Sequence, residues 1–191
     1  MSDTVLVPKK RMNLTPLSIF RENRAGRTSS LKWGLNAGYP RITVFINGAD
    51  RSINGRDNMI IVPFTHQSIN TLFGNIEAII DEPNDTTYRM DCYNNAWDNT
   101  TNKRKDEIEL QSSITVGKDS NGIIYLMVSA NGKPDVGFKL TIPEKYNRVY
   151  KNDEEITKTS ITSQRFTKMY LGQLVHAFRE FIKESTEVTD I

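Results

Sequence analysis

The sequence has one cysteine and two histidines among its 191 residues. A single cysteine, Cys92, cannot form an internal disulfide, so we expect a reducing, cytoplasmic environment. The histidines, His66 and His176, stand in no metal-ligand spacing, and we expect neither a metal nor any other cofactor. No apolar run approaches the roughly 18 residues that a membrane span needs, so no membrane partner is expected.

Motifs for catalysis are missing as well. The chain contains no Walker loop, no dinucleotide fingerprint and no serine elbow. Cys92 falls on the apolar side of an alternating segment, which predicts a small core residue in place of a nucleophile. Glu107 and Glu109 share one face of an expected strand, a pattern typical of a solvated surface. The sequence therefore indicates a protein that is not an enzyme.

Positive charge is concentrated near the start of the chain, although the net charge is only +2. Residues 1–60 hold ten lysines and arginines against four acidic residues, a net charge of +6, and the remainder carries −4. Clustered cations bind polyanions because they release counterions from phosphates. The alternative is a solvated surface that is merely uneven.

Residues 31–46 alternate between apolar and other side chains on both sides of a turn at 38–40. This period of two predicts a β-hairpin with one apolar face. Residues 59–62 form a third, fully apolar strand that stops at Pro63. The apolar face of the hairpin consists of Leu31, Trp33, Leu35, Ile42, Val44 and Ile46.

Two amphipathic helices are expected. The apolar spacing over residues 69–80 predicts the first, with Thr65 as its N-cap and Pro83 as its stop. The second runs from about Ser163 to Lys183. Between them we expect strands near 88–92, 108–116, 123–128 and 136–142, with polar loops at 94–104 and 143–159. The buried stripe of the second helix is Phe166, Tyr170, Leu174, Ala177, Phe178 and Phe181.

These elements predict an α+β fold of mainly antiparallel sheets, in the order strands, helix, strands, helix. Turn-linked strands exclude a parallel doubly wound sheet, which needs a helix between neighbouring strands. We expect a flexible basic arm at 1–29, a single domain at 30–183 and a short acidic tail at 184–191. A five-stranded OB barrel is the alternative architecture.

The polar face of the predicted hairpin offers a site for single-stranded nucleic acid. It presents Lys32, Arg41, Thr43 and Phe45, with Tyr39 at the turn. Aromatic rings stack on bases while cations follow the phosphate backbone, which is what sequence-independent binding requires. The alternative is that Phe45 packs beneath a helix or a partner.

Two further segments are candidate contacts. The arm carries Arg21, Arg24 and Arg27, and an arginine-rich segment can fold on phosphates; a disordered solubilising tail is the alternative. The second segment is the expected loop that contains Trp97. A tryptophan there predicts an anchor on nucleic acid, on a neighbouring subunit or on the protein's own surface. The cations of this loop are Lys103, Arg104 and Lys105.

Residues 31–35 (LKWGL) and 39–45 (YPRITVF) resemble the opening hairpin of phage single-stranded DNA-binding proteins. Residues 119–138, with GIIY at 122–125 and GKP at 132–134, resemble their later hairpin. The order of elements is similar to the Whirly fold. That resemblance implies two strand-and-helix repeats, helices that mediate oligomerisation and single strands that run along the sheets. It also implies a fourth strand in the first half, for which residues 4–7 are the candidate.

The resemblance implies a homo-oligomeric binder of single-stranded DNA, with RNA as a second ligand. Its place would be phage replication, recombination or transcription in the host cytoplasm. A phage RNA polymerase, with the chain as its cofactor, or replication proteins would be its partners. The alternative is a phage structural or assembly protein whose basic face meets an acidic protein.

Overall fold

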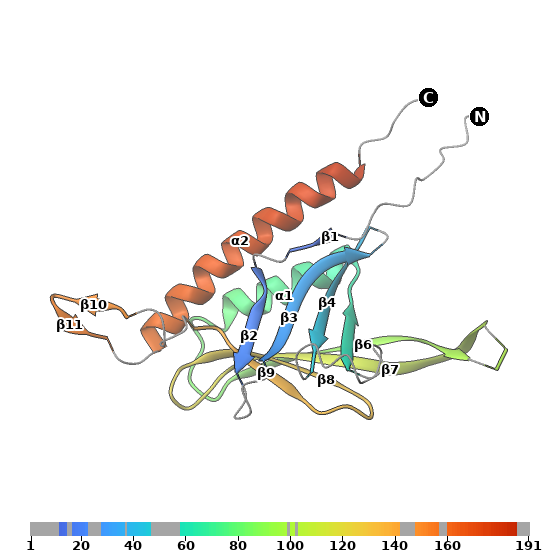
Figure 1. Ribbon diagram of the computed structural model, residues 1–191, viewed down its shortest axis with the longest axis horizontal. Coiled ribbons are helices and arrows are strands. Elements are labelled where there is room, and N and C mark those ends of the chain that lie inside the picture. The colour runs from blue at the N-terminus through green and yellow to red at the C-terminus, as the bar shows by residue number, and fades with distance from the viewer. Residues whose placement is uncertain are drawn as a thin grey trace.

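The computed structural model describes residues 12–14, 17–22, 28–36, 38–46, 58–98, 100–101, 103–141, 148–156 and 160–186. The chain forms an α+β fold of antiparallel sheets and two helices, in the predicted order of strands, helix, strands, helix (Figure 1). The main sheets are separate, so the described strands do not form one closed barrel. No helix in these ranges is long and apolar enough to cross a membrane.

The first sheet is built around β3, which pairs with β4 along one edge and with β1 and β2 along the other. β1 and β2 pair with successive parts of β3 and together fill the place of a fourth strand. The prediction of an arm over 1–29 is therefore wrong for these residues, and residues 4–7 lie outside the described ranges. The strands are β1 (Met12–Asn13), β2 (Ile19–Glu22), β3 (Thr28–Asn36), β4 (Tyr39–Phe45) and β5 (Met59–Pro63).

Helix α1 (His66–Ala78) follows β5 and begins as predicted at Thr65. The Ser68 N–H donates to Thr65 Oγ1 over 3.0 Å, and the Thr65 N–H donates to Ser68 Oγ over 2.8 Å. These two bonds satisfy helix donors that would otherwise lack partners. After the helix ends, the buried Lys118 Nζ donates to the carbonyls of Ile80 and Glu82. A cation here complements the negative end of the helix dipole.

The second sheet has the order β6-β7-β8-β9. β6 and β7 continue well beyond the body of the protein as a two-stranded ribbon (Figure 1). The predicted polar loop at 94–104 is therefore wrong, because these residues are mostly strand. Residues 94–104 have no core beside them, and their sequence lacks the apolar alternation that marks a half-buried strand. The strands are β6 (Thr87–Asp98), β7 (Lys103–Lys118), β8 (Ile124–Ala130) and β9 (Val136–Lys139).

Helix α2 (Ser160–Thr186) is longer than predicted at both ends, so residues 184–186 of the expected tail are helical. A hairpin of β10 (Tyr150–Lys151) and β11 (Glu154–Glu155) precedes it, where only a loop was expected. The buried Ser163 fixes α2 to the second sheet. Its hydroxyl donates to the Leu140 carbonyl and accepts from the Ile124 N–H, at 2.8 and 2.9 Å.

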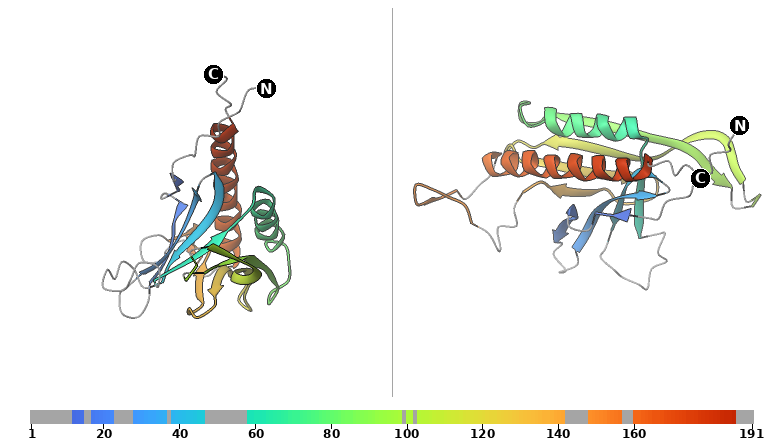
Figure 2. Two further views of the ribbon diagram at one scale, coloured as in Figure 1. Left: turned by 90° about the vertical axis from the view of Figure 1, so that its right-hand side faces the viewer. Right: turned by 90° about the horizontal axis from the view of Figure 1, so that it is seen from above.

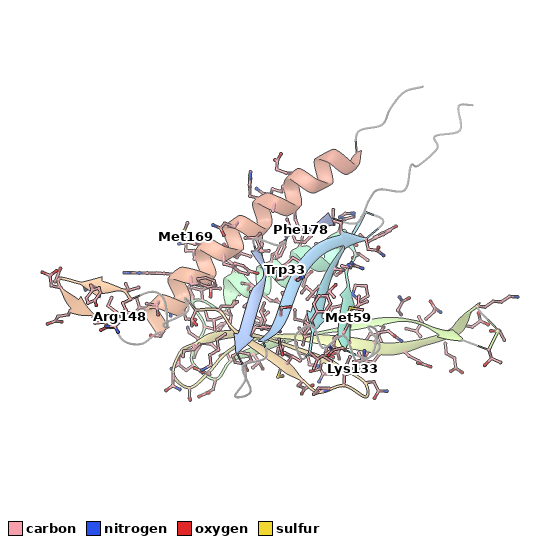
Figure 3. All side chains as sticks on the ribbon, in the orientation of Figure 1. Trp33, Met59, Lys133, Arg148, Met169 and Phe178 are labelled. Carbon is pink, nitrogen blue, oxygen red and sulfur yellow. The ribbon has the colours of Figure 1, made fainter. Side chains whose placement is uncertain are left out.

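The two helices lie side by side against the buried faces of the sheets (Figure 2). The side chain of Trp33 occupies the junction, with Phe73 of α1 and Phe178 of α2 at ring-centroid distances of 6.1 and 6.3 Å. Figure 3 shows Trp33 and Phe178 at this junction. Trp33 Nε1 donates to Tyr170 Oη over 2.6 Å, and Tyr170 Oη donates to the Leu17 carbonyl. Trp33 therefore joins both helices to the first sheet.

Candidate nucleic-acid interface

The first sheet buries one face and leaves the other without a helix. The predicted apolar residues of β3 and β4 are all buried. Both helices lie on that side of the sheet, and within the described ranges no helix covers the opposite face (Figure 2, left). We call this opposite side the outer face. Its register across β3, β4 and β5 has three rows: Ser30–Phe45–Met59, Lys32–Thr43–Ile61 and Gly34–Arg41–Pro63.

A cation and a ring are in contact on the outer face. Lys32 Nζ lies 5.0 Å from the centroid of the Phe45 ring. Both side chains are half-buried, so Phe45 is neither fully covered nor free of packing. Such a cation–π contact contributes about 0.5–1 kcal/mol at an exposed site. It holds a positive charge over the Phe45 ring on the outer face.

A second ring lies at the opposite end of β4. Tyr39 is 61% exposed, and its ring stacks on that of His66, with centroids 6.1 Å apart and planes at 30°. The turn before it places Gly38 at φ 81°, a left-handed conformation that favours glycine. The six-residue step from Tyr39 to Phe45 spans about 20 Å of strand. The outer face therefore has one aromatic ring at each end of β4.

Arg41 and Thr43 occupy the middle of the same strand, as the alternation predicts. Arg41 is half-buried and lies in register with Gly34, which leaves room beside it on β3. Thr43 is buried between its neighbours and presents little surface to a ligand. The cations of the outer face are thus concentrated on Lys32 and Arg41, and Thr43 serves mainly as packing.

The edge of the outer face contains residues that the sequence reasoning missed. Ile61 of β5 is 45% exposed, although β5 was predicted as a fully apolar strand. Lys133, in the turn between β8 and β9, donates from Nζ to the Met59 carbonyl, and Figure 3 shows the two residues near one another. Aligning the alternation of β5 with that of β4 would have found Ile61. The hydrogen bond from Lys133, beside the second sheet, to Met59 of the first sheet could not be predicted from the sequence.

Charge distinguishes the outer face from the corresponding face of the second sheet. β3, β4 and β5 contain no aspartate or glutamate. On the second sheet, Arg89 Nε lies 2.7 Å from Asp91 Oδ1. The hydrogen bond from Ser113, followed by that from Arg89, lowers the pKa of Asp91 below its ordinary value, so this carboxylate stays ionised. A polyanion would therefore meet a carboxylate beside Arg89 on the second sheet, whereas β3, β4 and β5 carry no carboxylate side chain.

The predicted arginine arm contributes little to this face within the described chain. Arg21 lies in β2, in register with Ser29 of β3. Ser29 is three residues from Lys32, so the two positions belong to opposite faces of the sheet. The backbone there is a paired strand and not a flexible arm. Arg24 and Arg27 lie outside the described residues.

The second predicted cluster is in the ribbon and is separate from the outer face. Trp97 is in register with Arg104, and Asp98 with Lys103. Lys103 is exposed, whereas the side chains of Trp97, Arg104 and Lys105 lie outside the described part of the structure. The ribbon projects away from β3 and β4 (Figure 1). The structure therefore divides the candidate residues into two groups.

Cys92 is packed against the core, as predicted. Burial, followed by the charge of Asp91, raises the pKa of its thiol from 9.0 to about 11. A thiol with this pKa is almost wholly protonated at neutral pH. It is therefore a poor nucleophile.

The raised pKa of Cys92 predicts a loss of stability in alkali. The folded state resists ionisation, so the stabilisation is complete below pH 9 and is lost as pH rises from 9 toward about 11. Urea unfolding at pH 8 and pH 10.5 should show a smaller fall in the free energy of unfolding for Cys92→Ala than for the wild type. Equal falls in the two proteins would contradict the assignment.

Among the described residues, no group of three histidine, cysteine, aspartate or glutamate side chains is placed to hold a metal ion. Comparisons of the chain with protein-family models, with curated proteins and with solved structures found no match. Functional residues are therefore assigned from this chain's own geometry. The outer face of β3, β4 and β5, with the rings of Tyr39 and Phe45, the cations Lys32 and Arg41 and no acidic residue in these three strands, is the candidate interface.

Proposed function

We propose that this chain binds single-stranded nucleic acid, single-stranded DNA in the first place, along the outer face of the first sheet. The observation that carries the proposal is the row of side chains on β4 and its neighbours. Tyr39 and Phe45 place rings at the two ends, and Lys32 and Arg41 place cations between and beside them. Rings and cations in alternation are what binding without sequence preference uses.

Each kind of side chain has a separate role. Phe45 and Tyr39 stack on bases, a contact worth about 1–3 kcal/mol per base. Lys32 and Arg41 neutralise phosphates and release their counterions, so affinity falls as salt rises. Duplex DNA buries its base faces in its own stack and can use only the cations. The proposed preference is therefore for single strands over duplex.

The proposed biological setting is phage replication, recombination or transcription, in a homo-oligomer that works beside a polymerase or replication proteins. The competing role is an assembly protein whose basic face meets an acidic protein. Oligonucleotide binding separates the two roles, because only the first requires it.

The salt dependence of binding tests the role of Lys32. For Lys32→Met, the slope of log affinity against log salt should become shallower by about 0.7, the value for one phosphate contact on a single strand. Fluorescence anisotropy of a labelled oligonucleotide from 50 to 200 mM salt measures this slope. Lys168→Met, at an exposed position of α2, is the matched control and should keep the wild-type slope. An unchanged slope for Lys32→Met removes this residue from the interface.

A further inference from the structure

The β6–β7 ribbon exposes apolar side chains on one of its faces. Tyr93, Ile108 and Leu110 are 61%, 68% and 40% exposed. Tyr93 is in register with Leu110, and Ile108 with Asn95, so the three side chains share one face. Side chains of the ribbon stand away from the rest of the molecule (Figure 3). A two-stranded ribbon alone in water is marginally stable, so this segment gains from a third strand.

The ribbon also offers an edge for such a strand. β8 pairs with β7 only over Ser112–Lys118. The described chain supplies no third strand beside residues 103–111 of β7. An exposed strand edge is a template for pairing with another chain.

The charge order of this edge identifies the strand that fits it. Residues 103–109 read KRKDEIE, with three basic residues followed by a mainly acidic half. Charged edges usually prevent association, because like charges meet. Here an antiparallel copy of the same segment would place its basic half against the acidic half. A two-fold axis near Asp106 sets Lys103 opposite Glu109 and Lys105 opposite Glu107, and the symmetry makes each pair twice.

We propose that this edge of β7 pairs antiparallel with the same edge of a second copy of the chain. The contact is isologous, as two-fold symmetry requires. It joins the two ribbons into one four-stranded sheet and places Ile108 and Leu110 of both copies on the same face of that sheet. This interface lies on the ribbon, apart from both helices and from the outer face of the first sheet. It does not rest on the proposed binding of nucleic acid.

Charge reversal tests the pairing with a built-in control. Lys103→Glu with Lys105→Glu makes the segment mainly acidic, and Glu107→Lys with Glu109→Lys makes it mainly basic. Sedimentation velocity over a concentration series should show a wild-type dimer. Each double variant should dimerise at least about tenfold more weakly, because like charges now meet across the strands. An equimolar mixture of the two variants should recover dimer, since the acidic and basic segments are again complementary.

Cysteine cross-linking gives a second readout. In a Cys92→Ala background, Asp106→Cys places a thiol next to its copy at the two-fold axis, within the reach of a disulfide. Mild oxidation should yield a covalent dimer. Lys168→Cys, on the exposed surface of α2, should form no covalent dimer under the same conditions. A wild-type monomer at all concentrations would overturn the proposal. So would variants that dimerise like the wild type, or cross-linking at position 168 alone.

Discussion

Replacing Trp33 with alanine is expected to lower the free energy of unfolding by about 3–5 kcal/mol, the usual cost of truncating a large buried aromatic. The Trp33 side chain is fully buried and meets rings from both helices. Its loss leaves a cavity where three elements join. Since domains are stable by about 5–15 kcal/mol, this one change removes a large part of the total. The melting temperature should fall by roughly 6–20 °C for a chain of this size.

Circular dichroism during heating and urea unfolding measures the Trp33 effect without tryptophan fluorescence. Trp33→Phe is the matched control, because it keeps a ring but loses the N–H that donates to Tyr170. A double-mutant cycle with Tyr170→Phe should give a coupling of about 0.5–1.5 kcal/mol, the net value of one buried hydrogen bond. A cost below about 1 kcal/mol for Trp33→Ala would contradict the placement of this side chain at the junction.

Removing the two rings of the outer face is expected to weaken binding of single strands more than removing any single cation. Phe45→Leu and Tyr39→Ala each delete one stacking surface, worth about 1–3 kcal/mol, or roughly 5- to 150-fold in affinity. Leucine at position 45 keeps apolar packing beneath Lys32. Tyr39 is exposed, so its truncation should leave the fold intact.

The salt dependence of binding distinguishes loss of a ring in Phe45→Leu and Tyr39→Ala from loss of a charge. Neither substitution changes a cation, so the salt slope should stay at the wild-type value while the affinity falls. Tyr150→Ala, at an exposed position of β10, removes a surface ring away from the first sheet and should bind like the wild type. If Phe45→Leu and Tyr39→Ala bind as tightly as Tyr150→Ala, stacking on the outer face plays no part in recognition.

The elements with a strong apolar period were predictable from the sequence. The hairpin of β3 and β4 follows from strict alternation. Of the stripe predicted for α2, Tyr170, Leu174 and Phe178 are buried, Phe166 and Ala177 are half-buried, and the side chain of Phe181 lies outside the described part of the structure. The capping of α1 by Thr65 was predicted from residue type alone and is confirmed with its bond from Ser68. In these elements the local pattern and the tertiary packing favour the same structure.

The elements that were not predicted from the sequence have no apolar period, for two physical reasons. β1 and β2 are short edge pieces that depend on the backbone of β3 for their pairing. The ribbon beyond Tyr93 is exposed to water on both sides, so alternation of hydrophobicity has no cause there. Residues of the candidate site were predictable where they lie on strands that the sequence predicted. Lys32, Arg41 and Phe45 were found, whereas Ile61 and Lys133 needed the register between separate elements.

The central claim is that the outer face of the first sheet holds single-stranded nucleic acid. Fluorescence anisotropy of the full chain tests this claim most directly, with one labelled oligonucleotide measured as a single strand and as a duplex at the same salt concentration. We expect affinity for the single strand at least about tenfold above that for the duplex, a difference of roughly 1.4 kcal/mol. Equal affinity for the two forms, or no binding to either, would contradict it.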